Sequence, residues 1–217
     1  PFAPPFDFLE RAFLPLLGRM GAKVEARLER HGFYPAGGGC IQVRVEPAQA
    51  LVPLELLERG ALLRRRGRVL LSNLPPHVAE RERKVAAQTL GWELGAIHIE
   101  PVPDPVGPGN AVIIEAESEH VTEAFTAFGA RGVRAEAVAG AAAQAAKDYL
   151  AAGVPVGPHL ADQLLIPLAL AGAGRFRTVP PTSHTRTNAE IVKMFLAVEV
   201  AMEMESGAAC RIEVKPR

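Results

Sequence analysis

The sequence predicts a mixed α/β (α+β) fold in which a repeated unit is interrupted by a middle segment. Apolar residues spaced three and four apart indicate helices, and short stretches of alternating polar and apolar residues indicate strands. The order helix, strand, strand near the start resembles the order helix, strand, helix, strand, strand near the end. The block between them has its own helices and strands, which indicates an insertion.

Composition indicates a globular protein without a dominant charge. The chain has 217 residues, 48% hydrophobic and 22% charged, with 24 basic and 24 acidic side chains. Any contact with nucleic acid therefore has to come from a local patch. Cys40 and Cys210 form no CxxC motif, and neither an export signal nor a bilayer-length apolar run is visible. We expect a cytoplasmic protein that has no disulfide framework, no zinc site and no contact with a membrane.

The first segment is expected to hold one helix and two strands. Asp7 is expected to be the N-cap of a helix whose buried stripe lies within residues 8–20. Alternating residues predict strands at 24–28 and 41–45. Because the first residue is Pro1 and not Met, we expect an N-terminal stretch to be absent.

The middle segment is expected to hold three strands and two helices, enough for a small α/β domain. The expected strands are 64–71, 96–100 and 111–117, and the expected helices are 77–92 and 135–150.

The last segment again shows a pattern of helices and strands like that of the first segment. Helices are expected at 160–170 and 189–196, a polar loop at 182–188, and strands at 176–179, 197–204 and 210–214.

Three motifs in the outer segments are similar to RNA 3′-terminal phosphate cyclases. They are HGFYPAGGG at 31–39, HLADQL at 159–164 and SHTRTN at 183–188. The middle segment adds agreement at 75–82 and at GPGN, 107–110. Each motif alone is weak evidence for this family, but five motifs in this order are specific to it. The chain therefore resembles the C-terminal portion of that family from Pro1 to about Val214.

The resemblance implies a large domain of repeated units, each with two helices on a four-stranded sheet. A smaller thioredoxin-like domain would be inserted at residues 60–152. The large domain would then comprise residues 1–59 and 153–217, with its first repeat and part of the second lying before Pro1.

The resemblance also implies an ATP-dependent reaction on RNA 3′-phosphate ends. A histidine takes AMP from ATP, passes it to the RNA phosphate, and the neighbouring 2′-hydroxyl then closes a 2′,3′-cyclic phosphate. Mg²⁺ or Mn²⁺ is expected because the phosphates of ATP need charge neutralisation. The metal ligand is expected before Pro1, so no residue of this chain is assigned to metal, and the fragment alone is expected to be weak or inactive. A homodimer is compatible with this picture.

His184 is the candidate catalytic residue. A neutral imidazole can attack phosphorus and later leave, which divides one difficult transfer into two easier ones. Without the family motif, a single histidine in a polar loop is more often a surface residue.

Asp162, Gln163, His159 and Pro4 are the candidate nucleotide-binding residues. Asp162 and Gln163 are polar residues on an apolar helix, so each needs a partner or a cleft. The resemblance suggests the adenylate ribose or His184 as that partner, and a helix N-terminal turn is the alternative. His159 stands where relatives often carry tyrosine, and Pro4 matches a residue that packs on adenine. Thr126 is a second position that differs from the family, because relatives often carry an aromatic residue there. Phe125 or Phe128 could supply the missing aromatic face.

Two further features remain open. Glycines 37–39 can cradle a phosphate, but the loop lacks the Lys-Ser/Thr of a P-loop, so a backbone requirement at a turn is the simpler explanation. The arginines at 64–68 can hold RNA phosphates or form a solvated face with nearby glutamates.

Two rival functions have to be weighed. Fold relatives that lack the nucleophilic histidine act in RNA processing or ribosome assembly, and His184 argues against that class. Carboxyvinyl-transferase-like enzymes share similar repeats, but their basic substrate motifs are not found in this sequence.

Overall fold

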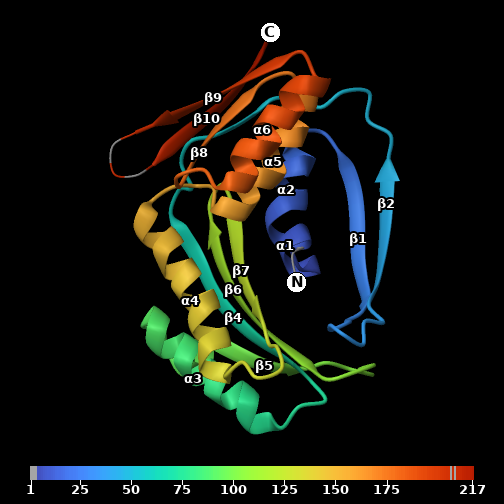
Figure 1. The fold of residues 1–217 in the computed structure, drawn as a ribbon, viewed down its shortest axis with the longest axis vertical. Coiled ribbons are helices and arrows are strands. Elements are labelled where there is room, and N and C mark those ends of the chain that lie inside the picture. Colours follow the sequence, from blue (N-terminus) through green and yellow to red (C-terminus); the bar gives the residue numbers. More distant parts are fainter. Residues whose placement is uncertain (1–3, 206, 208) are drawn as a thin grey trace.

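The computed structural model describes residues 4–205, 207 and 209–217. Pro1, on which the expectation of an absent N-terminal stretch rests, lies outside them. The described elements confirm a mixed α/β fold (Figure 1). In chain order they are α1 (Phe6–Phe8), the π-helical turn η1 (Leu9–Phe13), α2 (Leu14–Arg19), β1 (Lys23–Arg30), β2 (Cys40–Glu46), β3 (Leu54–Leu56), β4 (Leu62–Ser72), α3 (Pro76–Leu90), the 3₁₀ turn η2 (Leu94–Ala96), β5 (Ile97–Pro101), β6 (Gly109–Ser118), β7 (Thr122–Phe128), α4 (Ala135–Ala152), α5 (Pro158–Leu170), β8 (Gly174–Thr178), α6 (Ser183–Phe195), β9 (Val198–Met204) and β10 (Cys210–Pro216).

The N-terminal helix consists of α1, η1 and α2 in succession. Of its predicted stripe, Phe8, Leu16 and Met20 are buried in the core, together with Ala12, whereas Leu9, Phe13 and Leu17 are half-buried. The prediction that Asp7 caps this helix is wrong. Pro5 is the N-cap, and Asp7 lies inside the first turn, buried, with its carboxylate paired to Arg68 of β4. The ion pair with another element, and not a local amide, decides the position of Asp7.

Strands β1 and β2 form a two-stranded antiparallel ribbon, as the alternation predicted. Every residue of β2 is exposed, whereas alternate residues of β1 are half-buried on the side of α2. Figure 1 shows this ribbon lying beyond the N-terminal helix, on the side away from α4.

A four-stranded sheet with order β3-β8-β10-β9 carries helices α5 and α6. This arrangement is one complete unit of two helices and four strands. β3 was not predicted, because three residues with Leu54 and Leu56 buried are too short to show a period.

The second four-stranded sheet, with order β5-β4-β6-β7, packs one face against α3 and α4 and the other against the N-terminal helix (Figure 1). All its strands and both helices come from residues 62–152, between β3 and α5. The domain boundaries at 60 and 152 and the thioredoxin-like assignment stay predictions. Strand β7 was not predicted, since Ala and Glu, which have low strand propensity, make up three of its seven residues.

The glycine-rich motif at 31–39 packs against the loop that contains the GPGN motif. A Cβ on Gly109 would overlap the Phe33 side chain, and one on Gly38 would lie 2.7 Å from Val106. Gly37 and Gly38 also have positive φ angles of 68° and 77°. These glycines therefore satisfy a tight turn and a close contact between two segments, which supports the backbone explanation for the motif.

Among the described residues, no helix combines the length and apolar character that crossing a membrane requires.

Candidate active site

His184 lies in the first turn of α6. The expectation of a polar loop through residue 188 is wrong, because α6 begins at Ser183. Thr182 is the N-cap, and its hydroxyl accepts a hydrogen bond from the Thr185 amide at 3.1 Å. This cap, directly after two prolines, starts the helix earlier than apolar periodicity alone indicates. The His184 side chain is exposed.

Asp162, Gln163 and His159 lie on α5. His159 is the second residue of this helix and is exposed, whereas Asp162 and Gln163 are half-buried. Their neighbours Leu160 and Leu164 are fully buried in the core. The helix therefore turns its polar residues away from the core.

One side chain joins the two helices. The Asn188 amide donates to the Asp162 backbone oxygen at 3.0 Å and to its Oδ1 at 3.1 Å. Residues three or four apart share a helix face, so His184 lies on the same face as Asn188, and His159 lies on the same face as Asp162. Among the hydrogen bonds of the described residues, none joins His184 directly to Asp162 or to Gln163.

Sheet topology brings the starts of α5 and α6 together. β10 is antiparallel to both β8 and β9, so β8 and β9 run parallel, and β3 is parallel to β8. Both helices lead into these parallel strands and begin at the same end of the sheet. A parallel bridge between Val156 and Thr178, just before the two helices, fixes this arrangement. Ligands of open α/β sheets commonly bind at this end, outside the carboxyl ends of the strands.

Glu123 holds the start of α5 and was not predicted. It is 1% exposed, and its Oε1 accepts a hydrogen bond from the amide of Gly157, the N-cap of α5, at 2.5 Å. Burial raises the pKa of Glu123 to about 8, against the opposing effect of amide hydrogen bonds from Gly157 and Ala124. An acidic residue inside an apolar stretch is the only sequence signal of this role.

Pro4 precedes α1 and is exposed. The helix that it leads into contacts both α5 and β7 through η1. Nearby on β7, the Thr126 hydroxyl is buried, and it has no hydrogen-bond partner within the part of the chain that the structure describes. Phe125 cannot replace the missing aromatic face there, because it packs on Tyr149 in the opposite core with ring centroids 5.2 Å apart. Phe128 is exposed.

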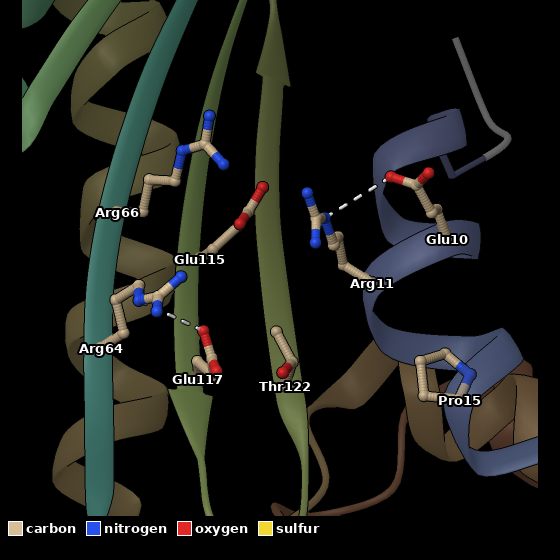
Figure 2. A pocket seen from close by; sticks show the side chains of 8 residues that line it. All are labelled: Glu10, Arg11, Pro15, Arg64, Arg66, Glu115, Glu117 and Thr122. Carbon is tan, nitrogen blue, oxygen red and sulfur yellow. Dashed lines mark ion pairs between the residues drawn. The ribbon is translucent and has the colours of Figure 1, made fainter. Parts of the chain in front are cut away.

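A polar cavity of about 280 Å³ lies between the N-terminal helix and the second sheet (Figure 2). None of the five predicted site residues lines this cavity. The residues that do are Glu10, Arg11, Pro15, Arg64, Arg66, Glu115, Glu117 and Thr122.

A family model described as RNA 3'-terminal phosphate cyclase matches residues 1–202. Relatives carrying that name come from Koribacter versatilis, 47% identical over 207 residues, and Pseudomonas aeruginosa strain UCBPP-PA14, 45% identical over 214 residues. The alignments cover 95% and 99% of this chain but 58% and 62% of the two relatives. The chain thus spans about three-fifths of the length of the curated relatives it matches. It belongs to the RNA 3′-terminal phosphate cyclase family.

Proposed function

We propose that the protein converts RNA 3′-terminal phosphates to 2′,3′-cyclic phosphates with ATP, through a covalent histidyl-AMP on His184 and an RNA-adenylate. The observation that carries the proposal is the exposed position of His184 beside the common start of α5 and α6. Asp162, Gln163, His159 and Pro4 are proposed to bind the nucleotide. A place in the cytoplasm and a homodimer stay predictions.

Three displacements at phosphorus make up the proposed reaction. A ring nitrogen of His184 attacks the α-phosphorus of ATP, so an N–P bond forms and pyrophosphate leaves. An oxygen of the RNA 3′-phosphate then attacks that phosphorus, and the N–P bond breaks. Finally the 2′-hydroxyl attacks the 3′-phosphorus and loses its proton, and AMP leaves.

The helix termini support this chemistry. The first turn of a helix carries partial positive charge and unpaired amides, which favour phosphate. His184 lies in such a turn, and the Asn188 to Asp162 hydrogen bonds fix the two helices relative to each other. A nucleophile on a fixed element loses less orientational freedom at each step.

Mg²⁺ or Mn²⁺ is proposed to accompany the phosphates of ATP, where it would neutralise charge. Within residues 4–205, 207 and 209–217, no three His, Cys, Asp or Glu side chains lie together as a metal site. No residue of this chain is proposed as a metal ligand, and the proposed steps use only side chains and substrates.

The test is transfer of label from α-labelled ATP to the longest natural polypeptide that contains residues 1–217. We expect label that is acid-labile and resistant to hydroxylamine, and RNA 3′-phosphate ends that become resistant to a phosphomonoesterase. His184→Ala should abolish the label, while His98→Ala, which alters another exposed histidine, should keep it. Equal label in the His184→Ala protein contradicts the assignment. Absence of any label in the unaltered protein favours the non-catalytic RNA-processing relatives.

A further inference from the structure

The cavity between the N-terminal helix and the second sheet has no role in the proposed adenylyl transfer. Three arginines and three glutamates line it. Figure 2 shows Arg11 reaching from the helix toward the strands, and Arg66 and Glu115 entering the same space from β4 and β6. The lining is therefore neutral overall but carries both strong hydrogen-bond donors and strong acceptors.

The three arginines that line this cavity form loose ion pairs. Arg64 lies 3.7 Å from Glu117, Arg66 lies 3.5 Å from Glu100, and Arg11 lies 3.4 Å from Glu10. A well-formed pair of this kind has an N–O distance of about 2.7–2.9 Å. These guanidinium groups therefore have donors left for a ligand.

Glu115, in the same lining, is held more closely. The Glu115 side chain is 9% exposed, and one of its oxygens lies 2.9 Å from Arg68. Arg68 also pairs with Asp7. Burial lowers the pKa of Arg68, but the carboxylates of Asp7 and Glu115 outweigh this effect and raise the pKa above its ordinary value. A carboxylate held in this way presents its remaining acceptor sites in a fixed direction.

The position of the cavity connects it to the proposed nucleotide residues. Glu10 follows Pro4 by six residues, about 9 Å at the rise of a helix. On the other side, Thr122 precedes Glu123, whose carboxylate accepts from the Gly157 amide at the start of α5. η1, which contributes Glu10 and Arg11 to the lining, also contacts α5, the helix that carries His159.

The chemistry of the lining selects a nucleobase over a free phosphate. A phosphate can use the three arginines but has no donors for the three carboxylates, whereas a base brings both acceptors and donors without charge. Guanine offers adjacent acceptors at O6 and N7 that match one guanidinium, and adjacent N–H donors at N1 and N2 that match one carboxylate. A volume of about 280 Å³ lies near the lower end of the range for ligand pockets, which suits a single base.

We infer that this cavity binds a guanine base close to the 3′ end of the RNA, with Arg66 donating to O6 and N7 and Glu115 or Glu117 accepting from N1 and N2. The inference rests on the proposed function only in taking RNA as the ligand. It assigns base preference to residues outside the adenylyl-transfer site.

The test is fluorescence anisotropy with the 217-residue chain and no ATP, using short labelled oligoribonucleotides that end in a 3′-phosphate. The oligonucleotides differ only in whether the last three bases are G, A, C or U. We expect the G-ended RNA to bind about 5- to 150-fold more tightly, the range that one bidentate base contact supplies. Arg66→Ala should reduce the preference to less than about twofold, the loss of that single contact.

Arg175→Ala is the matched control, because Arg66 and Arg175 are 38% and 41% exposed and each pairs with one glutamate. It should leave the preference intact. At least one of Glu115→Gln and Glu117→Gln, which both keep side-chain shape, should weaken the preference, and circular dichroism should show every variant folded. Equal binding of all four RNAs, no binding, or an equal loss in Arg175→Ala overturns the inference. A preference for 3′-phosphate over 3′-hydroxyl ends that depends on Arg66 without base preference also overturns it, since that describes a phosphate site.

The two proposals fail separately. His184→Ala should retain the base preference, because binding needs no covalent step. Conversely, Arg66→Ala should still form histidyl-AMP from ATP, because that step needs no RNA.

Discussion

Asn188 is the residue through which the second helix of the site is tied to the first. Its amide gives two hydrogen bonds to one residue, Asp162, at 3.0 and 3.1 Å. Asp162 was predicted from the sequence as a polar residue that needs a partner, and His184 as the nucleophile. The partner itself could not be predicted, because it lies 26 positions away on another helix.

Asn188→Ala should lower the free energy of unfolding by about 1 kcal/mol, since it removes the donor of a partly buried hydrogen bond. The substitution should also slow histidyl-AMP formation roughly tenfold, because α6 is held less firmly against α5 and His184 is oriented less precisely. Urea unfolding and single-turnover labelling measure the two effects. Gln144→Ala, which removes an exposed hydrogen bond within α4, should change stability by less than about 0.5 kcal/mol. An effect of Gln144→Ala as large as that of Asn188→Ala would contradict the assignment.

Glu123→Gln should change how stability depends on pH. The pKa of Glu123 rises from 4.5 to about 8 on folding. Its stabilising contribution is therefore complete below pH 4.5 and is lost as pH rises through 8, by up to about 1.4 kcal/mol per pH unit. Glu82, whose pKa burial raises to about 7, acts in the same direction, so only the comparison with the variant isolates Glu123.

Urea unfolding between pH 5 and 8 checks this prediction. The Glu123→Gln protein should lose less stability toward pH 8 than the unaltered protein does. Glu25→Gln, at an exposed position, should follow the unaltered profile. Parallel profiles for Glu123→Gln and the unaltered protein would mean that Glu123 is already ionised in the folded state.

At the scale of elements, long periodic segments were predictable and short or capped ones were not. The stripe of the N-terminal helix, the β1–β2 ribbon and the strand of four arginines follow from local pattern. The start of α6 depends on a cap at Thr182, and β7 depends on antiparallel pairing with β6. Tertiary partners decide such boundaries, so local periodicity misses them.

Two glycines test the explanation of the glycine-rich motif. A Cβ on Gly32 would overlap the Gly39 backbone nitrogen, so Gly32→Ala should destabilise the protein by about 1–3 kcal/mol through forced backbone movement. Gly140 lies inside α4, where an added Cβ would meet nothing within 4 Å, so Gly140→Ala should stabilise the protein by about 0.5–1 kcal/mol. Thermal or urea unfolding of both variants shows whether each substitution lowers or raises the free energy of unfolding. Equal effects would refute the close-approach explanation.

At the scale of the whole molecule, five short motifs in order predicted the family, which the match over residues 1–202 confirms. The mixed α/β class followed from the alternation of periods and is confirmed. The junction of α5 with α6, and of Glu123 with α5, could not be predicted, because sheet order brings together segments that are far apart in sequence. The charged cavity could not be predicted either, because its lining combines the N-terminal helix with three strands of the second sheet.

The most direct test of the central claim is to locate AMP on the protein after incubation with ATP and magnesium. Trypsin, which cuts after Arg177 and Arg186, releases a peptide of residues 178–186 in which His184 is the single histidine. Mass spectrometry under neutral conditions should find one AMP on this peptide, attached to the imidazole. AMP on any other peptide, with residues 178–186 recovered unmodified, would contradict the account.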